Sequence, residues 1–342
     1  MKRSVSFLLS TIIFVAAASA AFAWGDDGHQ TVGKIASLRI KPRTAQKIAQ
    51  ILKPGETLAS ISTWADTVKE RVGKTDPDPD TNAFLQDVIH NEKNREWHYD
   101  DLPLNCKTYQ TCTGFTPDND IVHMLNICIR TSQGHPDSNH PLGQRNALRL
   151  LVHFLGDIHQ PLHVGCGFID VNGPNHTILI VRDPVVIKQK NLPSDKGAND
   201  LVIDNDRKNL HSFWDFTLVT SLLNVVGQEI TSDTLGAFLQ QNAKPKASWN
   251  PHGPIRSWAA QWATDSLRQS RDHTYQSVKI AGQRTIPVLS HGQPVMQTVF
   301  DITRAANYEA VNRELVRQQL AKAGYRLAKL LDAIYAGANS EQ

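Results

Sequence analysis

The chain has 342 residues, of which 40% are hydrophobic and 20% are charged, and its formal net charge is +3. This composition is typical of a globular protein, and the length suits one large domain or two small ones. The small net charge excludes a strongly basic surface that would attract polyanions as a whole.

The N-terminus has the pattern of a secretory signal peptide. MKR is a short basic start, SFLLSTIIFVAAASA is an apolar run, and Ala21-Phe22-Ala23 fits the small-x-small rule for cleavage. We interpret residues 1–23 as a signal peptide that is cleaved after Ala23, and an uncleaved membrane anchor is the alternative. The protein would then be secreted or periplasmic, and no later stretch is apolar enough to span a bilayer.

Cleavage would remove Lys2 and Arg3 and no acid, so the formal net charge would fall from +3 to +1. A near-neutral protein has no global field that attracts nucleic acid. If it acts on nucleic acid or phosphate esters, something other than net charge must bind the phosphate.

Along the chain, the apolar spacing of helices recurs in segments 28–40, 42–52, 119–132, 144–159, 209–223, 256–271 and 304–335. The segment 176–190 alternates like two strands about an Asp-Pro turn, and 199–206 has the pattern of a further strand. No linker or internal repeat is evident. The sequence therefore predicts a single, mainly helical domain over residues 24–342, with a small β-hairpin insertion.

Four cysteines in an exported chain favour disulfides. Cys106 and Cys112 lie close together in a polar loop, so we expect them to pair first. Cys128 and Cys166 are candidates for a second bridge. The absence of CxxC spacing argues against metal ligation by these thiols.

The segment HFLGDIHQPLH carries three histidines and an aspartate in an otherwise apolar stretch. His153 and Asp157 are four residues apart and share a helix face, and a following proline lets His163 turn back from the next loop. His211 and Asp215 repeat the spacing. A single pair of this kind is often a surface ion pair. Two pairs among Leu, Phe and Trp indicate a zinc constellation, because buried carboxylates need partners.

The mature N-terminus adds further candidate ligands. Cleavage after Ala23 would leave a free amino group on Trp24, which can chelate a metal together with its own carbonyl, and His29 would supply a further nitrogen. Asp66 in STWAD and His98 in EWHYDDLP each lie close to a tryptophan.

The order of these motifs resembles that of the zinc-dependent, single-strand-preferring nucleases and 3'-nucleotidases named for the fungal nucleases S-one and P-one. The match comprises WGxxGH, WAD, WHY, HFLGDIHQPLH and NLHSFWD, and it extends from residue 24 to the C-terminal helix. The resemblance implies a phospholipase C/nuclease-like helical fold around a cleft with three zinc ions.

The resemblance also implies a ligand set for each zinc ion. The first would be bound by Asp66, His98, His153 and Asp157, the second by His163, His211 and Asp215, and the third by the amino and carbonyl groups of Trp24 with His29 and a shared Asp157. Nitrogen and oxygen ligands without thiolate suit catalytic zinc. His159 is not a ligand in this scheme, and we expect it to have a structural role.

By analogy with the family, a zinc-activated hydroxide between the metals that Asp157 bridges attacks phosphorus, and a further zinc stabilises the departing 3'-oxygen. Single-stranded DNA and RNA would yield 5'-phosphorylated products, and 3'-nucleotides would also be substrates. Asp66 and Asp157 would take part in catalysis as zinc ligands. Lys69 stands where family members commonly have an arginine near the scissile phosphate, and a solvated surface lysine is the alternative.

Tyr99 and Asp101 match the family's nucleobase site, where an aromatic face stacks on the base and a carboxylate accepts hydrogen bonds from it. Core packing is the alternative for Tyr99. The interval between His163 and His211 looks longer than in compact members, and we expect the hairpin at 176–190 to border the substrate cleft.

Two other functions fit parts of the pattern. A zinc phospholipase C shares the N-terminal tryptophan and the three-metal plan, but such enzymes typically end the ligand set with glutamate, where this chain has Asp215. A non-catalytic secreted zinc-binding protein would explain 14 histidines, although not the fixed order of the motifs. We expect the nuclease to act as a monomer without membrane association.

Overall fold

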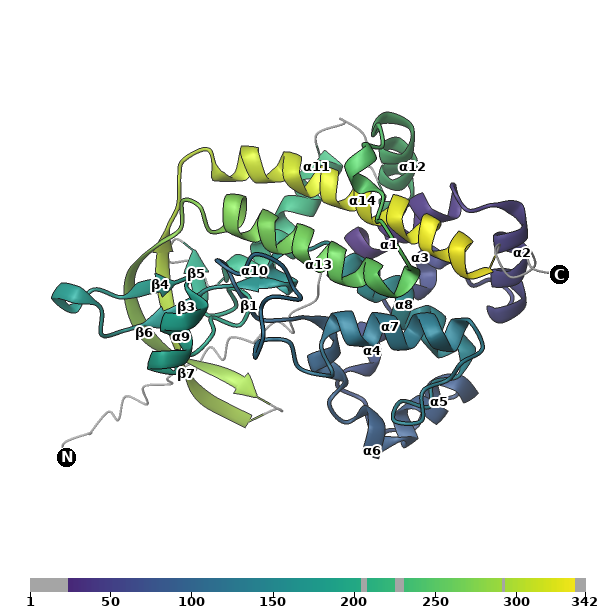
Figure 1. The fold of residues 1–342 in the computed structure, drawn as a ribbon, viewed down its shortest axis with the longest axis horizontal. Coiled ribbons are helices and arrows are strands. Elements are labelled where there is room, and N and C mark those ends of the chain that lie inside the picture. The colour runs from purple at the N-terminus through teal and green to yellow at the C-terminus, as the bar shows by residue number, and fades with distance from the viewer. Residues whose placement is uncertain (1–23, 204–207, 225–230, 291–292, 336–342) are drawn as a thin grey trace, which may run out of the picture.

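The computed structural model describes residues 24–203, 208–224, 231–290 and 293–335 (Figure 1). The expected signal peptide lies outside these residues. Helices form an elongated body, and the strands gather at one end of it. The described part of the chain thus confirms the mainly helical class with small β elements.

The described helices cover the seven expected apolar segments, with ends shifted by a few residues, and six further segments that the sequence did not predict to be helical. They are α1 (Gly25–Ser37), α2 (Pro42–Ile51), α3 (Leu58–Ile61), α4 (Trp64–Val68), α5 (Pro79–Gln86), α6 (Val88–Asn91), α7 (Ile121–Ser132), α8 (Gln144–Asp157), α9 (Pro184–Lys190), α10 (Leu210–Ser212), α11 (Leu218–Asn224), α12 (Ser232–Asn242), α13 (Trp258–Gln269) and α14 (Tyr308–Tyr335). The segment expected at 209–223 is divided, because a π-helical turn, η4 (Phe213–Thr217), separates α10 from α11.

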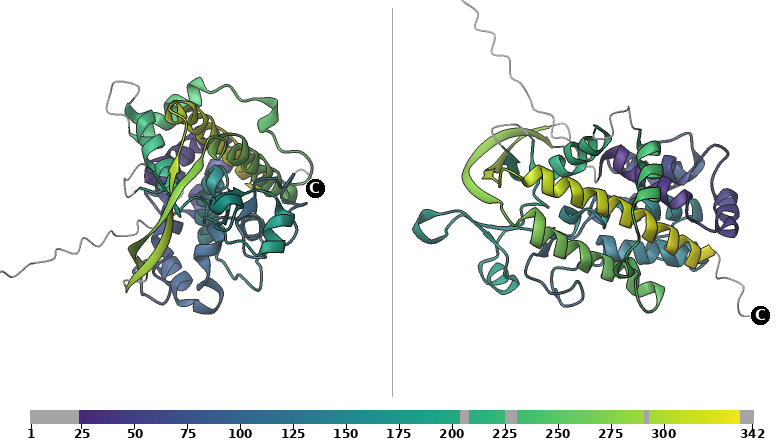
Figure 2. Two further views of the ribbon diagram at one scale, coloured as in Figure 1. Left: turned by 90° about the vertical axis from the view of Figure 1, so that its left-hand side faces the viewer. Right: turned by 90° about the horizontal axis from the view of Figure 1, so that it is seen from above.

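The strands form three small sheets. They are β1 (Leu102–Pro103), β2 (Gly165–Cys166), β3 (Phe168–Asp170), β4 (Leu179–Val181), β5 (Leu201–Ile203), β6 (Lys279–Ser290) and β7 (Gln293–Thr303). β1 pairs with β2 in parallel, β3 pairs with β4 in antiparallel orientation, and the third sheet has the order β5-β7-β6. The antiparallel β6–β7 hairpin runs as a long ribbon past the helical body (Figure 2).

The prediction of a hairpin at 176–190 is wrong for its second strand. β4 is present, but the residues after the Asp-Pro pair form helix α9. The side chain of Asp183 accepts hydrogen bonds from the backbone N–H groups of Val185 and Val186, and Pro184 occupies the first helical turn. Asp-Pro therefore acts here as a helix cap rather than as a strand turn. The strand expected at 199–206 is confirmed at Leu201–Ile203 by β5, and positions 204–206 lie outside the described residues.

Helix α8 forms the centre of the body, and every residue from Arg145 to Asp157 is buried. It contacts α1, α4, α7 and α14, which come from distant parts of the sequence. α8 packs as an internal helix, because its buried side chains are apolar except for the candidate ligands at its end and for Arg145, Asn146 and Arg149 in its first turns. Its C-terminal end is a rigid platform for the polar side chains of HFLGDIHQPLH.

The N-terminal helix α1 packs closely against the long C-terminal helix α14, which spans the body in Figure 1. At the contact, a Cβ atom added to Gly324 would lie 2.4 Å from Cβ of Ile35. Only a glycine permits this approach. The α14 contact fixes α1, and with it the position of His29.

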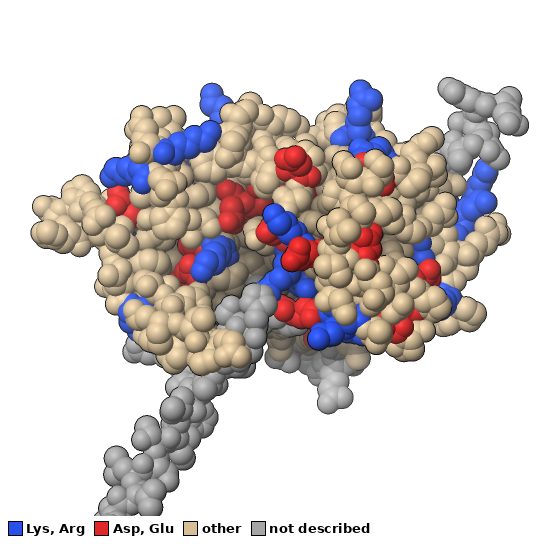
Figure 3. Space-filling view, turned by 90° about the horizontal axis from the view of Figure 1, so that it is seen from below, with Lys and Arg blue, Asp and Glu red and all other residues tan. Residues whose placement is uncertain are grey.

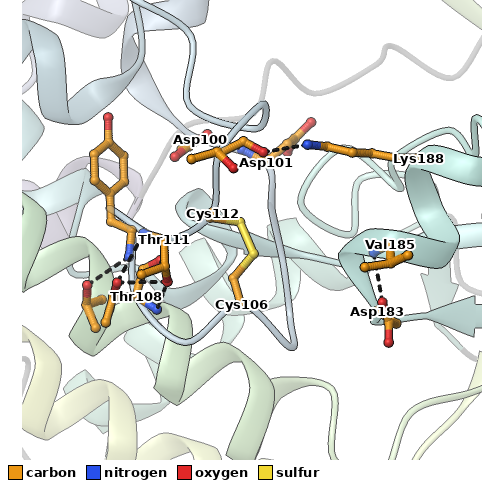
Figure 4. The surroundings of a disulfide bond; sticks show 12 residues. Asp100, Asp101, Cys106, Thr108, Thr111, Cys112, Asp183, Val185 and Lys188 are labelled. Carbon is orange, nitrogen blue, oxygen red and sulfur yellow. Dashed lines mark hydrogen bonds between the residues drawn. A yellow bond between two sulfur atoms is a disulfide. The ribbon is translucent and has the colours of Figure 1, made fainter.

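The disulfide expected first, Cys106–Cys112, is confirmed and closes the short loop drawn in Figure 4. The second expected bridge is wrong, because Cys128 and Cys166 are both free and buried. The thiol of Cys166 forms a hydrogen bond with the side chain of Asp101 instead. No helix in the described ranges is long and apolar enough to cross a membrane.

An ion-pair network fixes the start of α8. Glu56 accepts hydrogen bonds from Nε of Arg145 at 3.0 Å and from Nη2 of Arg149 at 2.9 Å. Partial burial opposes ionisation of Glu56, but the hydrogen bonds from Arg145 and Arg149 outweigh it and lower the pKa of this carboxyl to about 2. Since the folded-state pKa is depressed, Glu56 stabilises the fold above its ordinary pKa of 4.5 and loses this effect as the pH falls towards 2.

We predict that Glu56→Gln reduces the loss of unfolding free energy between pH 5 and pH 2, because the variant has no carboxylate to protonate there. Urea unfolding at a series of pH values measures this slope. Glu92→Gln, at an exposed position, is the matched control and should keep the wild-type slope. An unchanged slope in Glu56→Gln would contradict the assignment.

Candidate metal centre

Five buried side chains meet at the end of α8, where four of them lie around the carboxylate of the fifth, Asp157. Its Oδ2 lies 2.9 Å from Nδ1 of His98 and 3.1 Å from Nε2 of His153, while its Oδ1 lies 3.2 Å from Nε2 of His29. Oδ1 of Asp66 is 3.6 Å from Nε2 of His153. The two carboxylate oxygens of Asp157 therefore face different histidines, which is the arrangement that a bridging ligand requires.

These five side chains come from four elements of the fold. His29 lies on α1, Asp66 on α4 and His98 on the 3₁₀ turn η1 (Asn94–His98), while the other two lie on α8. The structure brings together the side chains that the sequence predicted for this part of the site. Their potential ligand atoms form two overlapping groups, each within 4.8 Å: His29 with Asp66 and His153, and His98 with His153 and Asp157.

A third group contains His163, His211 and Asp215, as the sequence predicted. Nε2 of His163 lies 3.0 Å from Nε2 of His211, which in turn lies 3.2 Å from Oδ2 of Asp215. His163 ends the 3₁₀ turn η2 (Pro161–His163), so the chain reverses after α8 as the proline indicated. This group adjoins the first two, because Nδ1 of His163 donates to the carbonyl oxygen of His98 at 2.7 Å.

Backbone carbonyls fix the protonation of three of these histidines. A carbonyl oxygen only accepts, so the histidine nitrogen that it contacts carries the proton and the other nitrogen keeps a free lone pair. These Nδ1 contacts are His153 to Ser62 at 2.6 Å, His163 to His98 at 2.7 Å and His211 to Gly197 at 2.6 Å. Each Nε2 atom that remains is directed into the cluster as a ready ligand.

Two of these histidines, His98 and His211, are also held in the neutral form that binds metals, whereas the charges of Asp157 and Asp66 outweigh burial and raise the pKa of His153. Burial, followed by the nearby Lys69, lowers the pKa of His98 to about 3. Burial, followed by the nearby His163, lowers the pKa of His211 to about 3 as well. Neutral imidazole is the form in which histidine ligates a metal ion.

Several buried polar atoms of the cluster form no hydrogen bond, although three of the carboxylate oxygens have a lysine or histidine nitrogen within 3.2 Å. They are both ring nitrogens of His29, both oxygens of Asp66, Oδ1 of Asp157 and Oδ2 of Asp215. Unpartnered carboxylate oxygens are costly to bury, and two facing Nε2 lone pairs repel each other. Divalent cations would satisfy these atoms together, and a donor set of imidazole and carboxylate without thiolate fits zinc.

Trp24 lies at this cluster, with its indole Nε1 donating to the carbonyl of Gly156 at 2.9 Å. Its backbone nitrogen lies 3.2 Å from Oδ1 of Asp215, and its carbonyl accepts from the backbone N–H of Gly28 at 3.1 Å. In this chain Ala23 precedes Trp24, so the nitrogen is an amide that donates a hydrogen bond. Only cleavage before Trp24 would convert it into an amine with a lone pair.

Lys69 belongs to the cluster rather than to the solvated surface. Its Nζ is 2.5 Å from Oδ1 of Asp66, and its side chain is 9% exposed. The alternative of a solvated surface lysine is therefore wrong. The ammonium group is close enough to the histidines to depress their pKa values, so it brings a fixed positive charge to the metal centre.

Tyr99 and Asp101 lie on the wall of a cavity of about 510 Å³. The tyrosine side chain is 40% exposed, which excludes simple core packing. Burial of the hydroxyl, followed by the charge of Asp101, raises the pKa of Tyr99 to about 12. The phenol thus stays protonated and offers both a ring face and a donor to the cavity.

The carboxyl groups beside Tyr99 are strongly perturbed, and Figure 4 draws them beside the disulfide loop. Burial, followed by the charge of Asp120, raises the pKa of Asp100 well above its usual range. Burial also raises the pKa of Asp101, whose Oδ2 accepts a hydrogen bond from Oγ of Ser194 at 2.7 Å. These carboxyls therefore titrate at a higher pH than exposed aspartates do.

Sequence reasoning missed several residues of these two regions. Phe115 and Phe168 join Tyr99 on the cavity wall and contact each other edge to face at 5.7 Å between ring centroids. Gln160, inside HFLGDIHQPLH, donates from Nε2 to Asp215 at 2.8 Å. Its position three residues from each of two candidate ligands, Asp157 and His163, was a usable signal, whereas no local pattern indicated the phenylalanines.

His159 lies outside the metal-capable groups. Its Nδ1 donates to the carbonyl of Leu155 at 2.7 Å, and its Nε2 accepts from Nη1 of Arg326 at 2.9 Å. Burial, followed by the charge of Arg326, lowers the pKa of His159 well below its usual range, so the ring is neutral. Its contacts fit the structural role that we expected.

The surface agrees with the small net charge. On the face shown in Figure 3, lysine and arginine side chains are interspersed with aspartate and glutamate around a hollow. No large area of one sign is visible on that face. Positive charge for a phosphate must therefore be supplied locally, as the composition indicated.

Comparison with known proteins identifies the family. The S1/P1 nuclease family model matches residues 24–336. The chain belongs to the S1/P1 nuclease family. This confirms the resemblance read from the motifs, and it makes the protein a hydrolase of phosphodiester bonds with the phospholipase C-like fold of that family.

Individual relatives are distant but match over nearly their whole length. Nuclease S1 of Aspergillus oryzae is 26% identical over 341 residues, covering 94% of each chain. Endonuclease 3 of Arabidopsis thaliana is 25% identical, covering 96% of this chain and 95% of its own length. Nuclease P1 of Penicillium citrinum is 28% identical, covering 91% of this chain and 98% of its own length.

We predict that Asp157→Asn lowers the number of bound zinc ions by at least one, because an amide cannot offer two anionic oxygens to two ions. Elemental analysis of the folded variant measures the count. Asp101→Asn is the matched control, since it removes a perturbed carboxylate outside the metal-capable groups and should leave the count unchanged. The same zinc content in Asp157→Asn and in the wild type would argue against the bridge.

Proposed function

We propose that this S1/P1 nuclease is an exported, zinc-dependent phosphodiesterase. It cleaves single-stranded DNA and RNA to 5'-phosphorylated products and removes phosphate from 3'-nucleotides. The observation that carries the proposal is the convergence of three groups of histidine and aspartate side chains around Asp157. The names of the relatives, which are nucleases and endonucleases, support the substrate class.

Three zinc ions are assigned to the ligand sets expected from the family. Asp66, His98, His153 and Asp157 would hold the first, His163, His211 and Asp215 the second, and Trp24, His29 and Asp157 the third. Zinc supplies Lewis acidity at such a site: it lowers the pKa of water and neutralises charge that develops on phosphate oxygens.

The chain's own residues orient this centre. Gln160 holds one oxygen of Asp215, and backbone carbonyls hold three imidazole rings. Because each ring is fixed by its protonated nitrogen, its lone pair needs no reorientation when a ligand binds. Lys69 adds a cation beside Asp66, where it can contact a phosphate oxygen as a point charge.

The cavity next to His98 supports a preference for single strands. Tyr99 directly follows this candidate ligand, so a base at the exposed tyrosine ring is close to the metal centre. Asp101 offers an acceptor for a base edge. A base reaches such a wall only when it is not stacked in a duplex, which favours single-stranded substrates.

Export is consistent with the described structure. The signal peptide pattern ends at Ala23, one residue before the family match begins at residue 24. The Cys106–Cys112 disulfide is typical of an oxidising compartment. We propose secretion or periplasmic location and action as a monomer.

The central experiment measures zinc content on the protein processed to begin at Trp24, beside hydrolysis of single-stranded DNA and RNA before and after chelation. We expect about three zinc ions per chain, because three ligand sets are available, and loss of cleavage on chelation. Phosphatidylcholine is the third substrate. Zinc without nucleic-acid cleavage but with release of the lipid head group would replace the nuclease by a phospholipase C, and zinc without any hydrolysis would indicate a zinc-binding protein.

A second prediction concerns the N-terminus. One residue added before Trp24 should sharply reduce turnover and zinc content while the melting temperature of the metal-free protein stays unchanged, because the added residue turns the amine back into an amide. A residue added after the C-terminal Gln342 is the control and should have no effect. Full activity of the N-terminally extended protein would refute the chelate.

A further inference from the structure

A second cavity, of about 580 Å³, is lined by Arg326, which donates to His159, and by residues not yet described. It is formed where the end of α1, the start of α2, the segment before α13 and the C-terminal half of α14 meet. In Figure 1, α2 lies beside the C-terminal end of α14. None of the residues on its wall belongs to the metal-capable groups or to the Tyr99 cavity. We call it the α14 cavity.

The wall of the α14 cavity is positively charged. Five cationic side chains line it: Arg39, Lys41, Lys246, Arg326 and Lys329. The one carboxylate on the wall, Asp332, accepts hydrogen bonds from the backbone N–H of Lys41 at 2.9 Å and from the hydroxyl of Thr44 at 2.6 Å. That carboxylate is thus engaged at the start of α2, and the wall keeps a surplus of positive charge.

A buried cation fixes the floor of the cavity. Arg326 is 5% exposed, and its guanidinium donates to the carbonyl of Trp249 at 2.9 Å and to Asp265 at 3.0 Å. Lys322, which is 8% exposed, shares the same oxygen of Asp265 at 2.8 Å. Two buried cations therefore share one carboxylate. An anion bound in the cavity would compensate the surplus charge.

Aromatic rings alternate with these cations. The guanidinium carbon of Arg39 lies 3.8 Å from the ring centroid of Tyr325, and Nζ of Lys329 lies 5.9 Å from that of Trp258. Trp249 contacts Tyr325 edge to face at 5.4 Å between ring centroids. Cations held against aromatic faces suit a ligand with both phosphate charge and flat bases, which single-stranded nucleic acid combines.

We propose that the α14 cavity is a second binding site for single-stranded nucleic acid, where it holds nucleotides of the substrate strand away from the bond that is cleaved. The inference rests on the proposed nuclease function. Five cations distributed over α1, α2, the segment before α13 and α14 exceed the charge of one phosphate, so the site fits several consecutive nucleotides rather than a free mononucleotide. It supplies part of the attraction for nucleic acid that the near-neutral surface lacks.

The test compares two double variants. The cavity variant carries Lys41→Glu and Lys246→Glu, and the control variant carries Lys107→Glu and Lys279→Glu. All four lysines are exposed, both variants change the charge equally, and the control positions line neither cavity. The proteins are processed and loaded with zinc, and equal melting temperatures verify the fold. The substrates are a thymidine dinucleotide, which has a single phosphodiester, and a strand of twenty thymidine nucleotides.

We expect the cavity variant to raise the KM for the long strand about tenfold and to reduce the slope of log KM against log salt by about 1.4, since each phosphate contact on a single strand contributes about 0.7. Cleavage of the dinucleotide should be unchanged. Equal KM values in the two double variants would overturn the second site.

The other outcomes separate the two proposals. The cavity variant could keep the wild-type KM for the long strand but be inhibited less than the wild type by thymidine 5'-monophosphate. This result would assign the cavity to free mononucleotides and contradict strand binding. Failure of the wild-type protein to cleave either substrate would overturn the proposed function, and the second site with it. Cleavage of both substrates without a difference between the double variants would overturn the second site alone.

Discussion

The buried carboxylate of Asp157 is the constraint on which the arrangement of the site depends. A carboxylate without solvent exposure is tolerated only with several partners of opposite charge or with donors. Its two oxygens face His29 on one side and His98 and His153 on the other, so α1, η1 and α8 must converge at one point. The chain solves this by placing a fully buried helix at the centre and packing the other ligand-bearing elements against it.

Helix α8 is held at both ends by charged groups that do not bind the metal. At its start, Arg145 and Arg149 share Glu56, and just beyond its end His159 accepts a hydrogen bond from Arg326 of α14. The same segment therefore provides ligands and the contacts that hold them still. HFLGDIHQPLH therefore carries one histidine, His159, that faces away from the metal-capable groups and contacts α14.

Electrostatics links the centre to its substrate class. The mature chain would have almost no net charge, and acidic and basic side chains are mixed on the face shown in Figure 3. A polyanion is then attracted only where positive charge is concentrated. The structure offers two such places, Lys69 beside the metal-capable groups and the cations of the α14 cavity, and the zinc ions that we propose would add a third. Each has a carboxylate engaged nearby, which limits unspecific attraction.

The sequence by itself determined the features that depend on short spacings. Helical periodicity predicted the helices of seven segments but not α3 to α6, α9 or α12. The four-residue spacing placed His153 with Asp157 and His211 with Asp215, and the close pair Cys106 and Cys112 formed its disulfide. These inferences hold because side-chain direction along a helix is fixed by local geometry. The ordered motifs added the family, and with it the candidate ligand sets that we propose.

Tertiary structure decided what depends on contacts between distant segments. It placed His29 beside Asp157 and Phe115 on the wall of the Tyr99 cavity. It also placed the thiol of Cys166 at the side chain of Asp101 instead of at Cys128. It also formed helix α9 where a strand was expected. The long β6–β7 hairpin was not predicted, because its sequence contains Gly282 and Pro287 and mostly solvent-exposed residues, which obscure the alternation typical of a strand. The physical reason is the same throughout: a local pattern records which face a side chain takes, and only packing decides what lies opposite that face.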